Sequence, residues 1–378
     1  MLQTSSSNMH IVIVGAGIVG LSTAYQLARR GHAVTLIERG PVPNPLAAST
    51  DHHRLIRYSY ADQPVYCARI REAFEHWRAM WAEFDRPEDH YYAATGILTL
   101  SQTAGDWGDR ARATLDDVGI AYRKYASVHE LETAFPFLET ANGAYGFLSE
   151  GGALMANRIM ADLADLLRSR GVKILEHSPV RSVDSRSGSA TLEDGRLIAG
   201  DCLVVTAGVN TAGLAAGMAL DLTPYRTVIV YADPPADLAE AYAGAPCWTD
   251  LGGDDDLWGV APVHDLPLKL GCGRLGRTDD ADGDRTMRRD EVEAMISAYR
   301  GRFRGIDDFE IRFCQANYWT RSPDERFVLE RADRLVAVSA CSGHGFKFGA
   351  LSGSDVADAV EGSVPVDRVK GRLAGLAA

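Results

Sequence analysis

The fold of this chain is decided by the stretch His10-Ile11-Val12-Ile13-Val14-Gly15-Ala16-Gly17-Ile18-Val19-Gly20. A β-branched run enters a glycine turn, a helical pattern leaves it, and a second apolar run ends at Glu38. In such a strand–helix–strand unit Gly15 permits the tight turn, Gly17 lets the backbone approach a pyrophosphate, and Gly20 lets the helix pack on the strand. The helix N-terminus presents unpaired N–H groups to that pyrophosphate. Because Glu38 is placed to accept a hydrogen bond from a ribose hydroxyl, the sequence predicts FAD or NAD rather than NADP.

Composition narrows the class of protein. The 378 residues suggest two or three domains, and no apolar run is long enough to cross a bilayer. The formal net charge of −12 argues against nucleic acid or an anionic membrane as partners. Residues 1–8 lack a basic-then-apolar export pattern, and the six cysteines show neither CxxC nor zinc-type spacing. We therefore expect a reduced, cytoplasmic protein, a monomer or small homo-oligomer, without a metal and without nucleic-acid or membrane partners.

The order of expected elements indicates two domains, the first assembled from separate segments. A buried strand at 203–208 ends in small residues, where backbone can lie close to a cofactor. From 224 to 313, short alternating strands separated by Pro and Asp/Gly loops indicate a mostly antiparallel sheet. A parallel strand at 335–339 and a helix at 350–360 then return to the first domain. We predict an α/β protein (α+β overall), in which a Rossmann-like cofactor domain (9–82, 145–215 and 325–378) carries an inserted, mostly antiparallel substrate domain (83–144 and 216–324).

Lysine is scarce in this chain, with five lysines among 39 basic residues. Two of the five lie within apolar sequence, Lys269 between two leucines and Lys347 between two phenylalanines. A buried ammonium group is costly unless it is paired or useful. We therefore expect both lysines to face the interior or a cleft.

Further stretches carry a family resemblance. They are Arg54-Leu55-Ile56-Arg57, Thr95-Gly96-Ile97-Leu98, Glu150-Gly151-Gly152-Ala153-Leu154, Pro224-Tyr225-Arg226, Leu268-Lys269-Leu270-Gly271, Ser322-Pro323-Asp324-Glu325 and Ser342-Gly343-His344-Gly345-Phe346-Lys347-Phe348. With these stretches the chain, over roughly residues 9–360, resembles the monomeric sarcosine oxidase and N-methyltryptophan oxidase group of the D-amino-acid-oxidase-like flavoproteins. The last stretch is the most specific, because a histidine and a lysine among glycines and aromatics are hard to explain by packing.

The resemblance implies FAD rather than NAD, and it makes the first domain the FAD-binding domain. Together with the glycine turn, it places around the cofactor Gly15, Gly17, Ile18, Gly20, Glu38, Arg39, Val180, Ala207, Gly208, Gly343, Gly345, Phe346 and Lys347.

The resemblance also implies roles for the cationic residues. Arg57 and Lys347 would hold the substrate carboxylate, because arginine with lysine forms a fixed cationic clamp. Lys269, with Arg54 on the same side of the flavin, would stabilise the negative charge that develops on O₂. His344 lies in the glycine turn and would hydrogen-bond substrate or flavin; a structural histidine with both nitrogens satisfied is the alternative.

Departures from the family pattern alter the expected pocket. Many members carry a flavin-linked cysteine seven residues before the aspartate of Ser-Pro-Asp-Glu, and this chain has Asn317 there. We therefore expect non-covalent FAD, since only a shift of register would bring Cys314 to that position. Two aromatic pocket positions of the family are Trp258 and Trp319 here, and a histidine of the family becomes Gly273.

The sequence predicts an FAD-dependent oxidase of a small amino acid. A secondary amine, N-methyl or cyclic, would pass a hydride to flavin N5 and leave as an imine, while O₂ becomes H₂O₂. Two alternatives stay open: a dehydrogenase of the same fold that uses another electron acceptor, and a flavin-binding pathway protein with altered catalysis. An NAD-dependent dehydrogenase is disfavoured, because no second nicotinamide-positioning motif is present.

Overall fold

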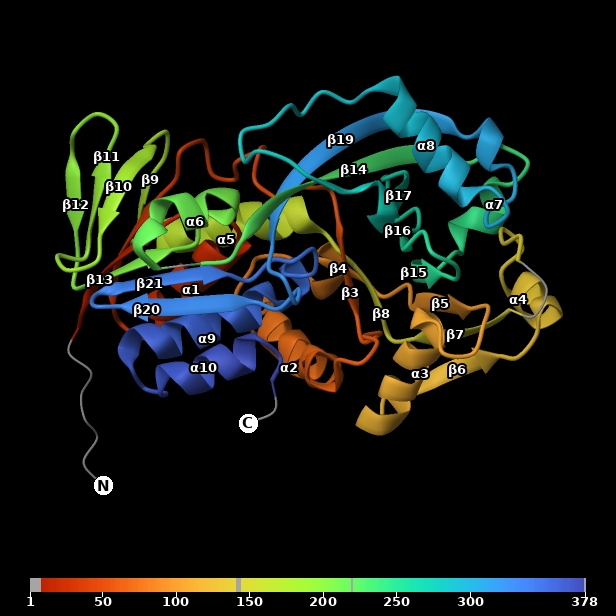
Figure 1. Ribbon diagram of the computed structural model, residues 1–378, viewed down its shortest axis with the longest axis horizontal. Coiled ribbons are helices and arrows are strands. Elements are labelled where there is room, and N and C mark those ends of the chain that lie inside the picture. The colour runs from red at the N-terminus through yellow and green to blue at the C-terminus, as the bar shows by residue number, and fades with distance from the viewer. Residues whose placement is uncertain (1–7, 141–143, 219, 377–378) are drawn as a thin grey trace.

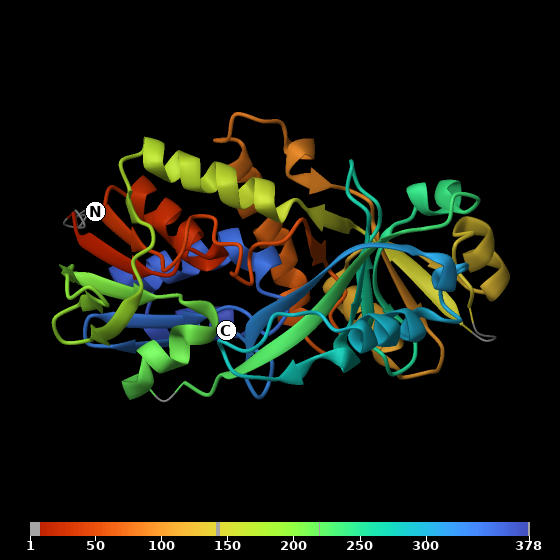
Figure 2. The same cartoon turned by 90° about the horizontal axis from the view of Figure 1, so that it is seen from above.

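The computed structural model describes residues 8–140, 144–218 and 220–376. Two sheets lie beside each other along the long axis, and the long strands β14 (Thr223–Asp233) and β19 (Glu310–Arg321) run from one towards the other (Figure 1). Seen from above, the same two strands lie side by side between the two halves (Figure 2).

The first sheet, called here the parallel sheet, has the order β20-β21-β13-β1-β2-β9 among the described residues. All neighbouring strands pair in parallel except β20 with β21. Its strands come from distant parts of the chain: β1 (His10–Val14), β2 (Ala33–Ile37), β9 (Lys173–Leu175), β13 (Cys202–Val205), β20 (Val328–Ala332) and β21 (Leu335–Ser339). The carboxyl ends of its parallel strands therefore meet at one edge, the usual cofactor position in open α/β sheets.

Alternation of side chains along β1 explains how both faces of the parallel sheet are covered. Ile11 and Ile13 point into one core with the helices, and Val12 and Val14 point into another core on the opposite face. The helical side holds α1 (Ile18–Arg29), α2 (Pro64–Trp81), α5 (Ala156–Ser169), α9 (Gly349–Glu361) and α10 (Val366–Leu373). The opposite side is covered by a small antiparallel sheet and a short helix, β10 (Val180–Asp184), β11 (Ser189–Leu192), β12 (Leu197–Ala199) and α6 (Thr211–Leu214).

The second sheet, called here the large sheet, is mostly antiparallel. Within the part of the chain that the structure describes, its order is β18-β14-β17-β16-β15-β5-β7-β6, and β19 pairs with the outer side of β14. The pairing of β15 with β5 is parallel. Besides β14 and β19, its strands are β5 (Ile97–Ser101), β6 (Tyr122–Tyr125), β7 (Tyr145–Ser149), β15 (Cys247–Leu251), β16 (Leu257–Val260), β17 (Leu268–Cys272) and β18 (Arg277–Thr278).

One face of the large sheet is packed on its own core. Part of the opposite face carries a smaller core, in which Ile97, Cys247 and Val260 pack on Ala153 and Met155, and the rest of that face carries residues of the expected site. Val228, Val230, Leu268 and Leu270 point into a core that is shared with α8 (Arg289–Tyr299). Because strand side chains alternate, Lys269 between the two leucines points to the opposite face. The remaining helices of this half are α3 (Trp107–Val118), α4 (Val128–Ala134) and α7 (Ala239–Ala243).

A third sheet joins the two halves. It has the order β3-β8-β4, with β3 (Arg54–Arg57), β4 (Tyr92–Ala93) and β8 (Gly151–Leu154). Residues 51–57 contain two histidines and two arginines, and their sequence predicts a loop. The segment instead ends in β3, because its backbone pairs with the glycine-rich β8.

The structure confirms the predicted fold class and moves one boundary. The strand expected at 335–339 is β21, and the helix expected at 350–360 is α9. Residue 145, where we expected the cofactor domain to resume, begins β7, which pairs with β5 and β6 in the large sheet. We therefore place the boundary after Ser149, since backbone pairing and not the hydrophobic pattern assigns this strand.

Among the residues that the structure describes, no helix is long and apolar enough to cross a membrane. The same residues contain no group of three or more His, Cys, Asp or Glu side chains that could hold a metal ion.

Candidate active site

The turn between β1 and α1 is shaped so that only glycine fits two of its positions. Gly15 has φ +101°, and a Cβ there would lie 2.5 Å from the carbonyl oxygen of Thr206. A Cβ on Gly20 would lie 1.9 Å from the carbonyl oxygen of Gly15. The turn, the helix and the end of β13 therefore approach one another more closely than any side chain allows, as a dinucleotide cradle requires.

The N-terminus of α1 is left open for an anion. Gly17 is the N-cap and has no side chain to cap the helix, and the Ser49 hydroxyl accepts the N–H of Ile18 at 2.9 Å. The first turn of α1 contains no acidic residue. Glu38 at the end of β2 is buried and accepts the N–H of Ala16 at 2.8 Å. Open N–H groups beside a buried carboxylate are the donor set that a pyrophosphate and a ribose need, so these residues fit FAD.

The other expected cofactor residues fall into two groups. Ala207 and Gly208 follow β13 directly beside this turn, and Gly345 approaches the carbonyl oxygen of Ala340 so closely that a Cβ would lie 1.8 Å from it. Two residues have other surroundings. Arg39 forms an exposed ion pair with Asp282 at 3.3 Å, and Val180 is half-buried at the start of β10.

Arg57 and Lys347 are brought together around Tyr60. The ammonium of Lys347 donates to the Tyr60 hydroxyl at 3.3 Å, and the guanidinium carbon of Arg57 lies 4.7 Å from the centre of the Tyr60 ring. Burial, and then the charge of Arg57, hold the pKa of Lys347 well below its usual range. Within the described residues neither cation has an ion-pair partner, and the buried Nη1 of Arg57 has no hydrogen-bond partner. After the role that the resemblance implies for Arg57 and Lys347, we call Arg57, Tyr60 and Lys347 the substrate-side cluster.

His344 takes part in this cluster as a neutral, fully bonded side chain. Its Nδ1 lies 3.0 Å from the Tyr60 hydroxyl, and its Nε2 lies 3.0 Å from the carbonyl oxygen of Glu325. Burial, and then the charge of Lys347, hold its pKa well below the usual value. Because both ring nitrogens are already bonded, the geometry favours the structural alternative, in which His344 orients Tyr60.

Lys269 and Arg54 meet in a second cluster, and a carboxylate lies between them. The Lys269 ammonium donates to Asp51 Oδ2 at 2.6 Å and to the His53 carbonyl oxygen at 2.9 Å. Arg54 and the hydroxyl of Tyr231 also donate to the Asp51 carboxylate. All these groups lie on or against the face of the large sheet that is opposite its own core, where Lys269 pairs with Tyr231 across β17 and β14. After the role that the resemblance implies for Lys269 and Arg54, we call Asp51, Arg54, Tyr231 and Lys269 the oxygen-side cluster.

The two expected tryptophans line the same face. The Lys269 ammonium lies 5.6 Å from the centre of the Trp258 ring. Trp319 donates from Nε1 to the Thr227 hydroxyl at 2.7 Å. A Cβ on Gly343 would lie 3.5 Å from the Trp319 ring, so the glycine loop contacts this tryptophan directly. The face of the large sheet and the loop before α9 thus form the two walls of one site.

Asn317 and Cys314 lie on opposite faces of β19. Asn317 is buried on the side of Trp319, where its side-chain oxygen accepts a hydrogen bond from Gln315 at 2.6 Å. Cys314 packs against the core of the large sheet on the other side. In this register Asn317, and not the thiol, faces the site.

Sequence reasoning missed four side chains of the site: Asp51, His53, Tyr60 and Tyr231. His53 is fully buried, and neither ring nitrogen has a hydrogen-bond partner among the described residues. The signal for Asp51 was present in the sequence, since an acidic residue heads the basic segment that ends at Arg57. Its pairing with a lysine 218 positions away depends on the tertiary fold, which the pattern does not contain.

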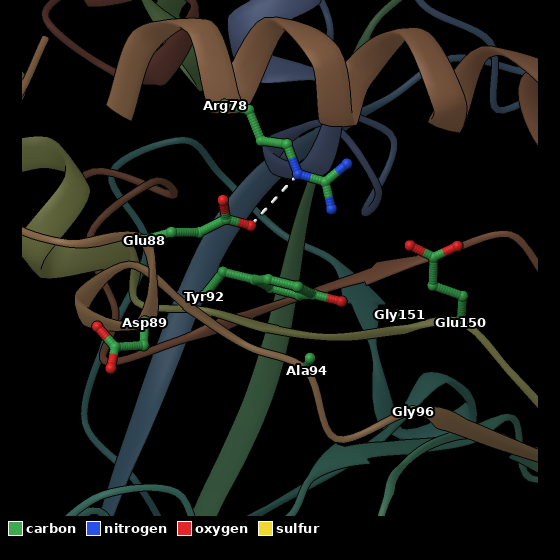
Figure 3. A pocket seen from close by; sticks show the side chains of 8 residues that line it. All are labelled: Arg78, Glu88, Asp89, Tyr92, Ala94, Gly96, Glu150 and Gly151. Atoms are coloured by element: carbon green, nitrogen blue, oxygen red, sulfur yellow. Dashed lines mark hydrogen bonds and ion pairs between the residues drawn. The ribbon is translucent and has the colours of Figure 1, made fainter. Parts of the chain in front are cut away.

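A separate surface hollow of about 570 Å³ contains none of the expected site residues. It is lined by Arg78, Glu88, Asp89, Tyr92, Ala94, Gly96, Glu150 and Gly151. In Figure 3 the Arg78 guanidinium pairs with Glu88, at 3.3 Å, and Glu150 lies across the hollow. We assign it no role in the site.

A two-lobed protein with a dinucleotide cradle and two clusters of cationic side chains beside a large sheet belongs to the class of nucleotide-cofactor oxidoreductases. Comparison with known families makes this specific. The model of the family "FAD dependent oxidoreductase" matches residues 10–359, and the chain belongs to this family. The expected sarcosine-oxidase-like flavoenzyme class is thereby confirmed.

Curated relatives match over nearly the whole chain. Peroxisomal sarcosine oxidase of Homo sapiens is 25% identical over 363 residues, which covers 90% of this chain and 89% of the relative. Monomeric sarcosine oxidase of Bacillus sp. (strain B-0618) is 24% identical and covers 91% and 90%. N-methyl-L-tryptophan oxidase of Yersinia pestis (strain Pestoides F) is 23% identical and covers 91% and 92%.

Solved structures share the fold at lower identity. NikD, described as an unusual amino acid oxidase essential for nikkomycin biosynthesis, is 22% identical with a TM-score of 0.81, and 98% of each chain is covered. The fructosamine oxidase Amadoriase II of Aspergillus fumigatus is 21% identical with a TM-score of 0.79, covering 99% of this chain and 90% of the other.

Proposed function

We propose that the protein oxidises the C–N bond of a small amino acid that carries a secondary amine, either N-methylated or cyclic. The amine binds neutral and loses a hydride from the carbon beside nitrogen, and the resulting imine is hydrolysed by water. When bound, FAD supplies the acceptor for that hydride at N5 and returns the two electrons to O₂, which becomes H₂O₂. The names of the relatives, which include sarcosine and N-methyl-L-tryptophan oxidases, support an N-methyl amino acid.

The observation that carries this proposal is a difference between the two cationic clusters: one contains a carboxylate, and the other contains none. On one side Asp51 compensates Lys269 and Arg54. On the other side Arg57 and Lys347 have no carboxylate partner among the described residues, and a buried N–H of Arg57 has no hydrogen-bond partner at all. A buried cation without a partner is unfavourable, so this cluster is built to receive an anion from outside the chain.

The substrate carboxylate supplies that anion in our proposal. Arg57 and Lys347 hold it, Tyr60 and His344 fix the lysine and the aromatic ring in place, and Trp258 and Trp319 form the walls beside the amine. Such holding fixes the carbon–hydrogen bond towards the cofactor and excludes water, and orientation of this kind supplies a large share of a rate enhancement. Lys269 and Arg54 provide fixed positive charge on the oxygen side.

We further propose that FAD is bound without a covalent link. Asn317 stands at the family's attachment position, and Cys314 packs into the core of the large sheet on the opposite face. Acid precipitation tests this: we expect the flavin to remain in the supernatant, and yellow protein in the pellet would contradict it.

We also propose a cytoplasmic monomer or small homo-oligomer that binds neither nucleic acid nor membranes. The net charge of −12 supports the absence of polyanionic partners. Size-exclusion chromatography with light scattering measures the oligomeric state.

Anaerobic bleaching of the flavin across primary, N-methyl and cyclic amino acids tests the proposed reaction. We expect rapid bleaching by a secondary amine and stoichiometric H₂O₂ when air is admitted. Bleaching without peroxide would favour a dehydrogenase with another acceptor. No bleaching by any compound, with FAD still bound, would favour a flavin-binding protein with altered catalysis.

A further inference from the structure

The centre of the oxygen-side cluster is Asp51, whose side chain is completely buried. Its carboxylate accepts hydrogen bonds from Lys269, Arg54, Tyr231 and the backbone N–H of His52. A carboxylate offers about four acceptor positions, so four donors saturate it. The contact with Lys269 measures 2.6 Å, a length typical of a charge-assisted hydrogen bond.

Without Asp51, two buried cations would face each other. Lys269 has one further acceptor, the neutral carbonyl oxygen of His53 at 2.9 Å. Arg54 has one besides the carboxylate, the carbonyl oxygen of Ala48. Two like charges in a poorly solvated site repel strongly, and a lysine escapes that repulsion by losing its proton.

We propose that Asp51 is a positioning residue of the oxygen half-reaction, which fixes the Lys269 ammonium in one orientation and keeps it protonated beside Arg54. The inference rests on the proposed function, since it concerns the step that Lys269 serves. Reduction of O₂ to H₂O₂ takes two electrons and two protons; the reduced cofactor supplies both electrons and one proton, and water supplies the other. Lys269 ends the step protonated, as it began.

The charge of the Lys269 side chain depends on the titratable and charged groups that face it. They come from the segment before β3, from β3 itself, from β14 and from β15: Asp51, His52, His53, Arg54, Tyr231 and Cys247. Burial first, and then Arg54, lower the pKa of Lys269. Burial also lowers the pKa of both histidines and raises the pKa of Tyr231 and Cys247, so these four groups are neutral near pH 7. Asp51 is therefore the anion that opposes deprotonation of Lys269.

The test replaces Asp51 by Asn, which keeps its size and removes its charge. Reoxidation of the reduced flavin by O₂ is followed by stopped flow from pH 6 to pH 10. We expect the rate of the Asp51→Asn enzyme to fall at a pH at least one unit below that of the natural enzyme, and Asp51→Glu to restore the natural profile. Asp51→Ser repeats the test in case the amide is not tolerated. Anaerobic flavin reduction should change less than threefold.

A second readout needs no turnover. In the Asp51→Asn variant Lys269 prefers to be neutral in the folded state, whereas its unfolded state binds a proton up to its ordinary pKa. Folding then becomes more favourable as the pH rises. The deficit in melting temperature of this variant, measured on the full chain with FAD, should therefore shrink between pH 6 and pH 9. The same deficit in an Asp51→Asn, Lys269→Met double variant should not change with pH.

Asp355→Asn is the matched control. Asp355 is another buried carboxylate, which pairs with Arg69 at 2.8 Å, and its loss should lower stability without shifting the reoxidation profile. An unshifted profile in Asp51→Asn, while Lys269→Met slows reoxidation, would overturn the role of Asp51 alone. Unchanged reoxidation in Lys269→Met would overturn the proposed oxygen reaction and this inference with it.

Discussion

Replacement of Arg57 by Gln tests the substrate-side cluster most sharply. The buried Nη1 of Arg57 has no partner among the described residues, so one charge-assisted hydrogen bond to a ligand is available there. Such a bond contributes about 1.5–3 kcal/mol, which corresponds to an increase of about 10- to 150-fold in the dissociation constant. Lys347 remains beside the ligand as a second hydrogen-bond donor, so binding is weakened and not abolished.

The assay is anaerobic flavin reduction as a function of substrate concentration. It separates the dissociation constant from the limiting rate, and a small aliphatic carboxylate without an amine reports on the clamp through the flavin spectrum. Arg69→Gln is the control, because Arg69 is a buried arginine that is already paired with Asp355 at 2.8 Å. The reasoning is refuted if Arg57→Gln binds the carboxylate as tightly as the natural protein, or if Arg69→Gln weakens binding equally.

Three further predictions follow from the same geometry. Lys269→Met should slow flavin reoxidation by about 100-fold, because a unit charge about 5 Å from a developing anion contributes roughly 3 kcal/mol at an effective dielectric constant of about 20. Stopped-flow measurements should show that the rate of flavin reduction changes only a few-fold. An equal loss of rate in flavin reduction and flavin reoxidation would contradict the prediction. Gly20→Ala should abolish FAD retention, since the added Cβ would lie 1.9 Å from a backbone oxygen of the turn. The ratio of flavin to protein absorbance measures how much FAD the variant retains. A variant that retains FAD fully would refute the assignment of this turn as the FAD cradle. Glu291 is largely buried and, although burial opposes it, hydrogen bonds from Arg226 and its neighbours lower its pKa from 4.5 to about 2. The stabilisation it provides is thus complete above pH 4.5 and lost as the pH falls towards 2; Glu291→Gln should cost about 3–5 kcal/mol at neutral pH and flatten the dependence of the melting temperature on acid, and an unchanged acid dependence would disprove the pairing.

The two cationic clusters show where sequence reasoning succeeds. Lys269 and Lys347 stand out because each is a lysine inside an apolar run, and a buried ammonium has to be paired or used. The structure confirms that both are buried, Lys269 in β17 and Lys347 in the loop before α9. The dinucleotide cradle can also be predicted from the sequence, because the backbone contacts at Gly15 and Gly20 leave no room for any other residue.

What the sequence does not contain is the pairing between distant segments. Asp51 is recognisable in the sequence as an acidic residue near arginines. Its contact with Lys269 arises because the small sheet that contains β3 packs beside the large sheet that contains β17. In the sequence, nothing distinguishes Tyr60 from an ordinary core aromatic residue. The structure shows that Tyr60 contacts both Arg57 and Lys347. Such roles depend on which side chains are in contact in the tertiary structure, and the local periodicity of the sequence does not predict these contacts.

The same limit explains the misplaced boundary at residue 145. The segment Tyr145–Ser149 has no pattern that distinguishes a strand of one sheet from a strand of the other. Its assignment follows from hydrogen bonds to β5 and β6. The break falls instead at the paired glycines of β8, of which Gly152 leaves no room for a Cβ, because one there would lie 2.0 Å from the carbonyl oxygen of Ala93.

A crystal structure of the protein with FAD and a small carboxylate would test the central claim most directly. Our account predicts the flavin ring between the two clusters, with Lys269 facing one side of the ring and the carboxylate bound to Arg57 and Lys347 on the other. A ring that contacts neither lysine, or a carboxylate bound away from Arg57, would contradict it.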